Sequence, residues 1–409
     1  MPVRPHLSIT CLLATALTLT SLVACDSGTT ANSLVLWHAW GGAELSALRT
    51  LSARYQAQFP GREVLLLQVP YDKLKDKYIR STAANGGPDL VIGDADWSGK
   101  FAASELALRI DNWFSEAELS RFHPGALAAL KRGDRLCAIP ESRETVALYY
   151  NRRHVTKPPT TVEELLALSA AIGRQSADKV KGFVFNGEFY YAMGWFFGAG
   201  ARLFEESGRV AVASEAANSA VSLVGQLAKA PGVMVSHEYA KPDSWYKQGQ
   251  AAMIVNGPWA LVDYQKALGD GLGVAKLPRW SNTRASAPWV GVKCLMFNPN
   301  SDDAHRRMAK DFALFVTSPE SQALLAEQAG HIPAIRGYTA PEGSPLAVFN
   351  AQADEGTPVS ISPDMAAVWE PMNKALRKVV QGEAPTPEAL GEAARSIQAK
   401  VDEIRAHQP

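Results

Sequence analysis

Residues 33–69, SLVLWHAWGGAELSALRTLSARYQAQFPGREVLLLQV, contain two strand-like runs with a helix-like run between them. The outer runs, 33–38 and 62–69, are short and mostly apolar, as buried strands are. Between them, apolar side chains recur at helical spacing up to the helix-stopping pair Pro60-Gly61: Leu45, Leu48, Leu51, Tyr55 and Phe59. A strand–helix–strand unit of this kind predicts two parallel strands joined by a right-handed crossover.

The same alternation continues along the chain. A helix-like stretch at 72–87 ends at two glycines, and a third strand is predicted at 88–94. Further strands are predicted at 145–151, 181–186, 251–256, 272–278 and 290–298, and helices at 160–173, 188–197, 215–230, 302–317 and from 318 onward. Roughly the last 65 residues predict helices only. No Gly/Ser-rich linker separates the two halves, so we expect an α/β protein of two lobes joined by a hinge of crossing strands.

The N-terminus has the pattern of a targeting segment. Arg4 precedes an apolar run at 7–24, and SLVACDS (21–27) resembles a bacterial lipobox. We therefore predict a lipoprotein signal peptide at 1–24 and lipid attachment at Cys25, followed by Asp26, which resembles an inner-membrane retention signal. An ordinary secretory signal or a single transmembrane helix is the alternative, although the run is rich in Thr and Ser and barely long enough to span a bilayer.

The composition argues against several classes of function. Lys and Arg number 41 and so do Asp and Glu, so no bulk field attracts a nucleic acid. The motifs HExxH, GxSxG, GxxxxGK[ST] and GxGxxG are absent, and the 8 histidines lack metal-ligand spacing. We predict neither an enzyme nor a metal or cofactor site, with a pair of carboxylates for glycoside hydrolysis as the alternative. Cys137 and Cys294 are expected to be buried free thiols, with a disulfide as the alternative.

Aromatic side chains gather at the ends of the predicted strands. Trp259, for example, stands directly behind the turn Gly257-Pro258, where loops gather at a cleft. Ligands bind at the carboxyl ends of strands in open α/β sheets, and an indole offers a flat apolar face to a sugar ring while carboxylates accept its hydroxyl protons. Core packing is the alternative for each ring alone, and we assign Trp37 and Trp113 to the core. Together with neighbouring acids, the others predict a polar, aromatic cleft: Trp40, Trp97, Tyr190, Tyr191, Trp195, Trp259, Trp289, Trp369, Asp94, Asp96, Glu144 and Glu188.

Five collinear stretches carry a resemblance to a known family. They are GPDLVIGDADWSGKFAASELALRID (87–111), AIPESRETVALYYNRRHVTKPPTTVEEL (138–165), GQAAMIVNGPW (249–259), APWVGVKCLMFNPNS (287–301) and SPDMAAVWEPM (362–372). Together they resemble the family 1 extracellular solute-binding proteins of ABC importers, most closely the maltose-binding members. The resemblance implies a two-lobed periplasmic-binding-protein fold (type II, maltose-binding-protein-like). Lobe 1 is then expected at 33–142 and 294–340, and lobe 2 at 146–289 and 341–409, with crossing strands near 143–145 and 290–293.

The resemblance also implies roles for individual residues. By position it implies that Asp96 binds sugar hydroxyls and that Glu144 is a ligand-binding acid on the hinge side. It also implies that Tyr190 supplies an aromatic contact and that two tryptophans, Trp259 and Trp369, stack on sugar rings.

The first lobe departs from the maltose-binding members. Gly93 and Trp97 stand where those members have a tryptophan and an arginine, and HAWGG (38–42) replaces an Asp-Lys pair. The segment WHAW is similar to the corresponding segment of other family members, including those that bind glycerophosphate and trehalose. We therefore predict that His38, Trp40 and Trp97 contact the ligand.

These observations predict a lipid-anchored periplasmic binding protein for an α-linked di- or oligosaccharide of the maltose, maltodextrin or trehalose type. It would be a monomer that delivers its ligand to the inner-membrane permease subunits of an ABC importer. Three alternatives remain at this point. The first is a binder of glycerol phosphate or a polyol, for which Lys100, Lys247 and Arg143 are candidate contacts. The others are a lipid-anchored glycosidase and a sensor subunit that presents bound ligand to a receptor.

Overall fold

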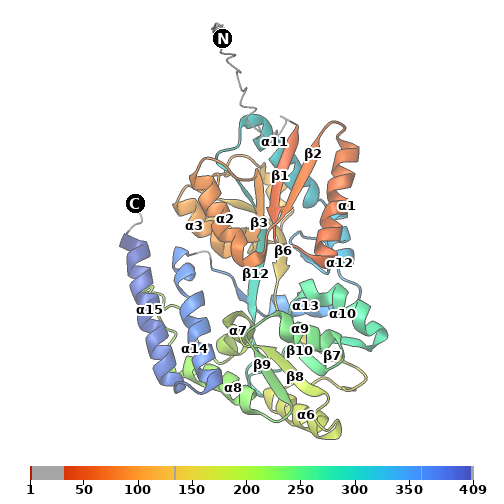
Figure 1. Cartoon of the computed structure of the whole chain (residues 1–409), viewed down its shortest axis with the longest axis vertical. Helices are drawn as coiled ribbons and strands as arrows, with labels where there is room; N and C mark the ends of the chain where they lie inside the picture. The colour runs from red at the N-terminus through yellow and green to blue at the C-terminus, as the bar shows by residue number, and fades with distance from the viewer. Residues whose placement is uncertain (2–31, 133–134, 361, 407–409) are drawn as a thin grey trace.

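The computed structural model describes residues 1, 32–132, 135–360 and 362–406, and its elements form two lobes, one above the other in Figure 1. Residues 2–24 of the predicted signal peptide and Cys25 lie outside this described part, so both predictions stay untested. Among the residues described, no helix has the length and hydropathy needed to cross a bilayer.

The sheet of the upper lobe contains the strand–helix–strand unit predicted at residues 33–69. β1 (Ser33–His38) pairs in parallel with β2 (Glu63–Gln68) and with β3 (Leu90–Asp94). β12 (Trp289–Phe297) runs antiparallel between β3 and β6 (Ala138–Glu144), and β13 (Ile332–Pro333) pairs with the other side of β6. The strand order is therefore β13-β6-β12-β3-β1-β2.

Helices cover this upper sheet. α1 (Gly42–Gln58) buries Leu48, Leu51 and Tyr55, three of the residues whose spacing predicts it. The others are α2 (Tyr71–Ala83), α3 (Ala95–Ala103), α4 (Glu116–Ser120), α5 (Pro124–Ala128), α11 (Asp303–Val316) and α12 (Pro319–Ala329). A two-stranded ladder of β4 (Lys131–Arg132) and β5 (Arg135–Leu136) completes the lobe.

The lower lobe has a second sheet with the strand order β11-β7-β10-β8-β9. Its strands are β7 (Ala147–Asn151), β8 (Lys181–Asn186), β9 (Val233–Ser236), β10 (Ala251–Asn256) and β11 (Leu272–Ala275). β8 lies parallel to β9 and β10, whereas β7 is antiparallel to β10 and β11. The helices around it are α6 (Val162–Gln175), α7 (Phe189–Gly198), α8 (Glu215–Lys229), α9 (Ala240–Lys247), α10 (Leu261–Leu268) and α13 (Pro345–Asp354), with short turns η1 (Pro258–Ala260) and η2 (Gly269–Gly271).

The C-terminal segment ends in two helices beside α8, as Figure 1 shows in blue and green. They are α14 (Trp369–Gln381) and α15 (Thr386–Ala406), and the turn η3 (Pro363–Ala367) before them packs against both α15 and α3 of the upper lobe. The expectation of helices only in this segment is wrong at β14 (Thr357–Pro358), which pairs in parallel with the start of β12. Two residues that end on a proline are too short for a period-two pattern to reveal.

The chain passes between the two sheets more than once. Residues 144–147 connect β6 to β7, residues 275–289 connect β11 to β12, and residues 333–345 connect β13 to α13. The first two passages run side by side, because Gly291 of β12 pairs with Glu144 of β6. Because the chain crosses between the lobes at paired strands rather than through one long linker, the two lobes can rotate about these crossings. The lobe boundaries given above remain a prediction.

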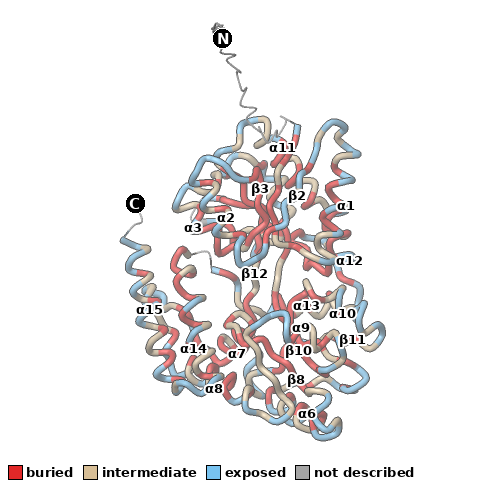
Figure 2. Tube along the Cα trace, viewed as in Figure 1, coloured by how far each residue is buried: buried red, intermediate tan, exposed pale blue. Residues whose placement is uncertain are grey.

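Each sheet is the centre of a buried layer, as the red segments in Figure 2 show. Trp37 is buried, and Trp113 packs half-buried on Phe297, so both belong to the core as expected. Cys137 and Cys294 are both buried and no disulfide joins them, as predicted.

Candidate functional site

A cavity of about 750 Å³ lies where the two lobes face each other. Its upper wall comes from the loop after β1 and from the start of α2 and of α3, its lower wall from α7, η1 and α14. The crossing strands contribute Glu144, Trp289 and Lys293 between them. Strand ends and helix starts therefore converge on one cleft, as the open-sheet rule leads one to expect.

All but one of the predicted binding residues line this cavity. They are Trp40, Asp96, Trp97, Glu144, Tyr190, Trp259 and Trp369. Tyr191 and Trp289, two other aromatic residues predicted for the cleft, also line the cavity, whereas the prediction is wrong for Trp195, which is buried in the core. His38 does not line it, because its side chain is fully buried beneath Trp40 and accepts a hydrogen bond from the Trp40 amide (Nδ1 to N, 3.1 Å). Burial lowers the pKa of His38 to about 4, so it is a neutral core residue.

Trp259 owes its position to the turn in front of it. A Cβ atom at Gly257 would lie 2.0 Å from the indole ring, so the ring folds back over a backbone that only glycine leaves free. The indole Nε1 donates to the hydroxyl of Tyr239 at 3.1 Å. Tyr190 lies beside it, with ring centroids 6.1 Å apart and planes inclined by 43°. The half-buried indole is thus held in one orientation at the wall of the cavity.

Trp369 connects the two lobes. It is the first residue of α14, and its Nε1 donates to Asp96 Oδ2, at the start of α3, at 2.9 Å. Trp289 meets it edge to face, with centroids 6.3 Å apart at 84°. Burial, and next the carboxylate of Asp94, raise the pKa of Asp96 above its usual value. Asp96 therefore already uses one oxygen to hold a ring of the opposite lobe.

A charged group forms the back of the cavity at the crossing strands. The ammonium of Lys293 contacts Asp94 and lies 3.5 Å from Glu144 Oε2, and the hydroxyl of Tyr71 donates to Asp94 Oδ2 at 2.6 Å. Burial disfavours the charge of Lys293, but Asp94 and Glu144 outweigh it and raise the lysine pKa. Burial also raises the pKa of Glu144 to about 7, against the opposing effect of Lys293. Sequence reasoning missed Lys293, whose one signal is a single charge inside the apolar run of β12.

A second charged group supports the upper wall. His331 lies between two carboxylates, with Nδ1 3.0 Å from Glu141 Oε1 and Nε2 3.1 Å from Glu44 Oε1. Glu44 lines the cavity, and Trp40 meets the His331 ring edge-on at 4.9 Å. This group was also missed, because its members are far apart in sequence.

Two cavity-lining side chains hold a buried polar atom without a partner. Tyr190 Oη and Trp40 Nε1 make no hydrogen bond within the part of the chain that the structure describes. Buried hydroxyl and indole donors are normally satisfied, so each of these two atoms lacks the partner that such a donor usually has.

The basic residues suggested for a phosphate ligand lie elsewhere. Arg143 pairs with Asp354 at 3.1 Å, Lys247 pairs with Asp243 at 2.7 Å, and Lys100 is exposed on α3. None of the three lines the cavity. Among the described residues, no group of three or more His, Cys, Asp or Glu side chains is arranged so that it could hold a metal ion. The cleft instead combines aromatic faces, carboxylates and amides with two lysines, Lys75 and Lys293, and Lys293 is already paired with Asp94 and Glu144. This lining suits hydroxyl-rich neutral ligands.

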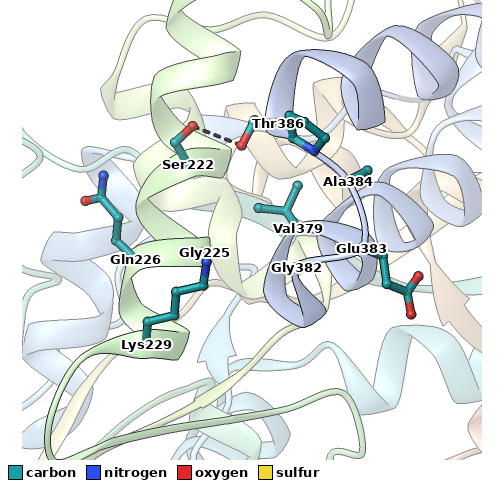
Figure 3. Close-up of a pocket in the computed structure, with 10 residues that line it drawn as sticks. Ser222, Gly225, Gln226, Lys229, Val379, Gly382, Glu383, Ala384 and Thr386 are labelled. Atoms are coloured by element: carbon teal, nitrogen blue, oxygen red, sulfur yellow. Dashed lines mark hydrogen bonds between the residues drawn. The ribbon is translucent and has the colours of Figure 1, made fainter.

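A smaller hollow of about 410 Å³ lies in the lower lobe between α8, α14 and α15 (Figure 3). It includes Ser222, whose hydroxyl donates to Thr386 Oγ1 at 3.0 Å. No predicted binding residue lines it.

Comparisons with known proteins agree with this architecture. A family model described as bacterial extracellular solute-binding protein matches residues 50–350. The maltotriose-binding protein of Pyrococcus abyssi is 28% identical over 367 residues, which cover 87% of this chain and 78% of that protein. A maltooligosaccharide ABC transporter solute-binding lipoprotein of Streptococcus pneumoniae is 26% identical over 287 residues, or 63% of this chain and 64% of its own length. The structure of a Thermus thermophilus maltotriose-binding protein bound with maltotriose aligns with a TM-score of 0.82 and 26% identity, covering 90% of this chain and 100% of that one.

Proposed function

The chain belongs to the bacterial extracellular solute-binding protein family, and from that premise we propose that it binds a maltodextrin-type di- or oligosaccharide for an ABC importer. The observation that carries the proposal is the cavity between the lobes, in which Trp259 and Trp369 stand beside the carboxylates of Asp96 and Glu144. Support comes also from the relatives just described, whose names refer to maltotriose and maltooligosaccharides.

The physical basis is the fit between a pyranose and such a cleft. The C–H face of a sugar stacks on an indole, which contributes about 0.5–1.5 kcal/mol beyond buried area. Each neutral hydrogen bond to a hydroxyl adds about 0.5–1.5 kcal/mol net. Micromolar affinity requires about 8 kcal/mol, so several rings and polar groups must act together. Two lobes that close on the sugar bring them together and expel water.

Binding and closure are linked in this proposal. Trp259 and Tyr190 belong to the lower lobe and Trp40 and Trp97 to the upper, so one sugar touches both walls only when the lobes approach. Contacts made only in the closed form shift the equilibrium toward it. The closed form then docks on the inner-membrane permease subunits and releases the sugar to them.

We extend the proposal to the anchor and the cell compartment. Acylation of Cys25 after removal of 1–24 would hold a monomeric protein in the periplasm at the outer leaflet of the inner membrane, if Asp26 acts as a retention signal. A lipobox-like sequence supports this, as does the lipoprotein among the relatives. Growth with a labelled fatty acid should label the unmodified protein but not Cys25→Ser, and absence of label from the unmodified protein would contradict lipid anchoring.

The ligand is tested by titration. Intrinsic tryptophan fluorescence of the purified protein should change saturably with maltose, maltotriose or maltotetraose, because tryptophans line the cavity. Trehalose and glycerol phosphate serve as the competing ligand types. Chromatography of each sugar after prolonged incubation separates binding from hydrolysis. No response to any oligosaccharide, or release of shorter sugars, would overturn the proposal.

A further inference from the structure

Tyr71 is an exposed aromatic residue that is nevertheless fixed in place. It begins α2, lines the cavity, and leaves 59% of its surface exposed. Its hydroxyl, however, donates to Asp94 Oδ2 at 2.6 Å, and Asp94 is itself held by Lys293. Burial of this hydroxyl raises its pKa, with the negative charge of Asp94 adding to the effect. The polar end of the side chain therefore points inward, and the exposed part is the ring.

The two faces of the Tyr71 ring have different surroundings. The ammonium of Lys293 lies over the ring at 5.1 Å from the centroid. A cation held over an aromatic face stabilises the ring in that orientation. With the hydroxyl bonded to Asp94 as well, the ring has two attachments that hold it in place beside the cavity that it lines.

Trp97 extends this aromatic surface into the cavity. Its centroid lies 6.1 Å from that of Tyr71, with the planes inclined by 39°. The indole is 5% exposed and rests on Gly93, where a Cβ would come within 2.5 Å of the ring. Lys75 lies over the indole at 5.7 Å. A buried indole and an exposed phenol thus form one tilted pair on the wall of the cavity.

We propose that Tyr71 and Trp97 form an outer sugar subsite on the upper lobe, which stacks on a further pyranose unit of an oligosaccharide. This inference rests on the function proposed above and adds a preference for chains of three or more units over disaccharides. A neutral pyranose suits the pair, because its flat C–H face covers exposed aromatic area without displacing the charges of Asp94 and Lys293. The Tyr71 side chain loses little conformational freedom when a sugar binds, because its ring is already held in place.

Calorimetric titration of the mature protein with maltose, maltotriose and maltotetraose tests the subsite. Tyr71→Ala should weaken binding of the two longer sugars by roughly 3- to 10-fold, the range expected of one aromatic contact, and change maltose binding by less than about 2-fold. Tyr71→Phe keeps the ring and should retain most of the preference for longer sugars. Tyr338→Ala is the matched control, because Tyr338 is half-buried and does not line the cavity.

The outcomes separate the subsite from the function on which it rests. Equal losses for all three sugars, or no loss for the longer ones, would overturn the subsite while leaving the proposed function intact. Failure of the unmodified protein to bind any of the three sugars would overturn both. If Tyr71→Ala lowers the thermal midpoint, Tyr71→Leu, which keeps bulk without an aromatic face, takes its place in the same comparison.

Discussion

Replacing His331 by Gln tests the charged group that supports the upper wall of the cleft. The ring is almost fully buried, Glu141 is fully buried, and both ring nitrogens lie within about 3 Å of a carboxylate oxygen. Burial alone would lower the pKa of His331, but Glu141 and Glu44 raise it from 6.5 to about 10. The imidazole is therefore protonated at neutral pH and donates to both acids.

The magnitude follows from leaving a buried carboxylate without its cation. Breaking a buried ion pair by removing one partner costs about 3–5 kcal/mol. The pKa change gives the same order, because each pKa unit corresponds to about 1.4 kcal/mol. Since the pKa is raised on folding, the stabilisation is complete below pH 6.5, the unfolded value, and is lost as the pH rises through about 10.

Urea unfolding at a series of pH values between about 6 and 10 measures this. His331→Gln should lose about 3–5 kcal/mol of the free energy of unfolding at pH 6–7, and the difference from the unmodified protein should shrink toward pH 10. His154→Gln is the control, because His154 is exposed on the loop after β7 and should cost less than about 0.5 kcal/mol. A loss below about 1 kcal/mol for His331→Gln, or a loss independent of pH, would refute the reasoning.

Three further predictions concern the cleft. Trp259→Ala and Trp369→Ala should each weaken sugar binding by about 1–3 kcal/mol in calorimetry, with Trp113→Phe unchanged, and normal affinity in both would refute the stacking role. Gly257→Ala places a Cβ 2.0 Å from the indole, so it should displace Trp259 and weaken binding about as much as removing the ring, with little change in thermal midpoint; wild-type affinity would contradict this. Because the pKa of Glu144 is about 7, its ionised, hydroxyl-accepting form grows as the pH rises from 6 to 8, and affinity should rise with it. Glu144→Gln should remove this dependence of sugar affinity on pH. If the variant and the unmodified protein show the same dependence, Glu144 is not its source.

Local patterns in the sequence allowed four strands of the first sheet, β1, β2, β3 and β12, to be predicted, whereas β6 and β13 were missed. Most of the cleft residues were predicted from their positions at strand ends together with the family resemblance. Helical spacing before Pro60-Gly61 and the turn Gly257-Pro258 are local features, and each sets an element or a ring that the structure contains. The same kind of pattern also explains the error at His38. Alternate residues of a strand share a face, and His38 follows Leu34 and Leu36, which are fully buried. Its place in β1 therefore assigns it to the core rather than to the ligand.

The charged groups of the cleft could not be found in this way. His331 contacts Glu141 and Glu44, which are 190 and 287 positions away, and Lys293 contacts Asp94 at a separation of 199. A single sequence holds no periodicity that connects such positions. Only the folding of β12 between β3 and β6, and the return of the chain at β13, brings these charges together.

The bond between Trp369 and Asp96 gives the proposed closure a specific physical form. Asp96 belongs to the upper lobe and accepts from an indole of the lower lobe through Oδ2. We propose that its other oxygen, Oδ1, accepts from a sugar hydroxyl. A sugar that stacks on Trp369 and donates to Oδ1 is then held by both partners of one interlobe hydrogen bond. A hydrogen bond to a charged acceptor contributes about 1.5–3 kcal/mol. The bond between Trp369 and Asp96 forms only when the two lobes are together. The ligand and the closed arrangement therefore stabilise each other, which is the coupling that an importer needs to distinguish the loaded protein from the empty one.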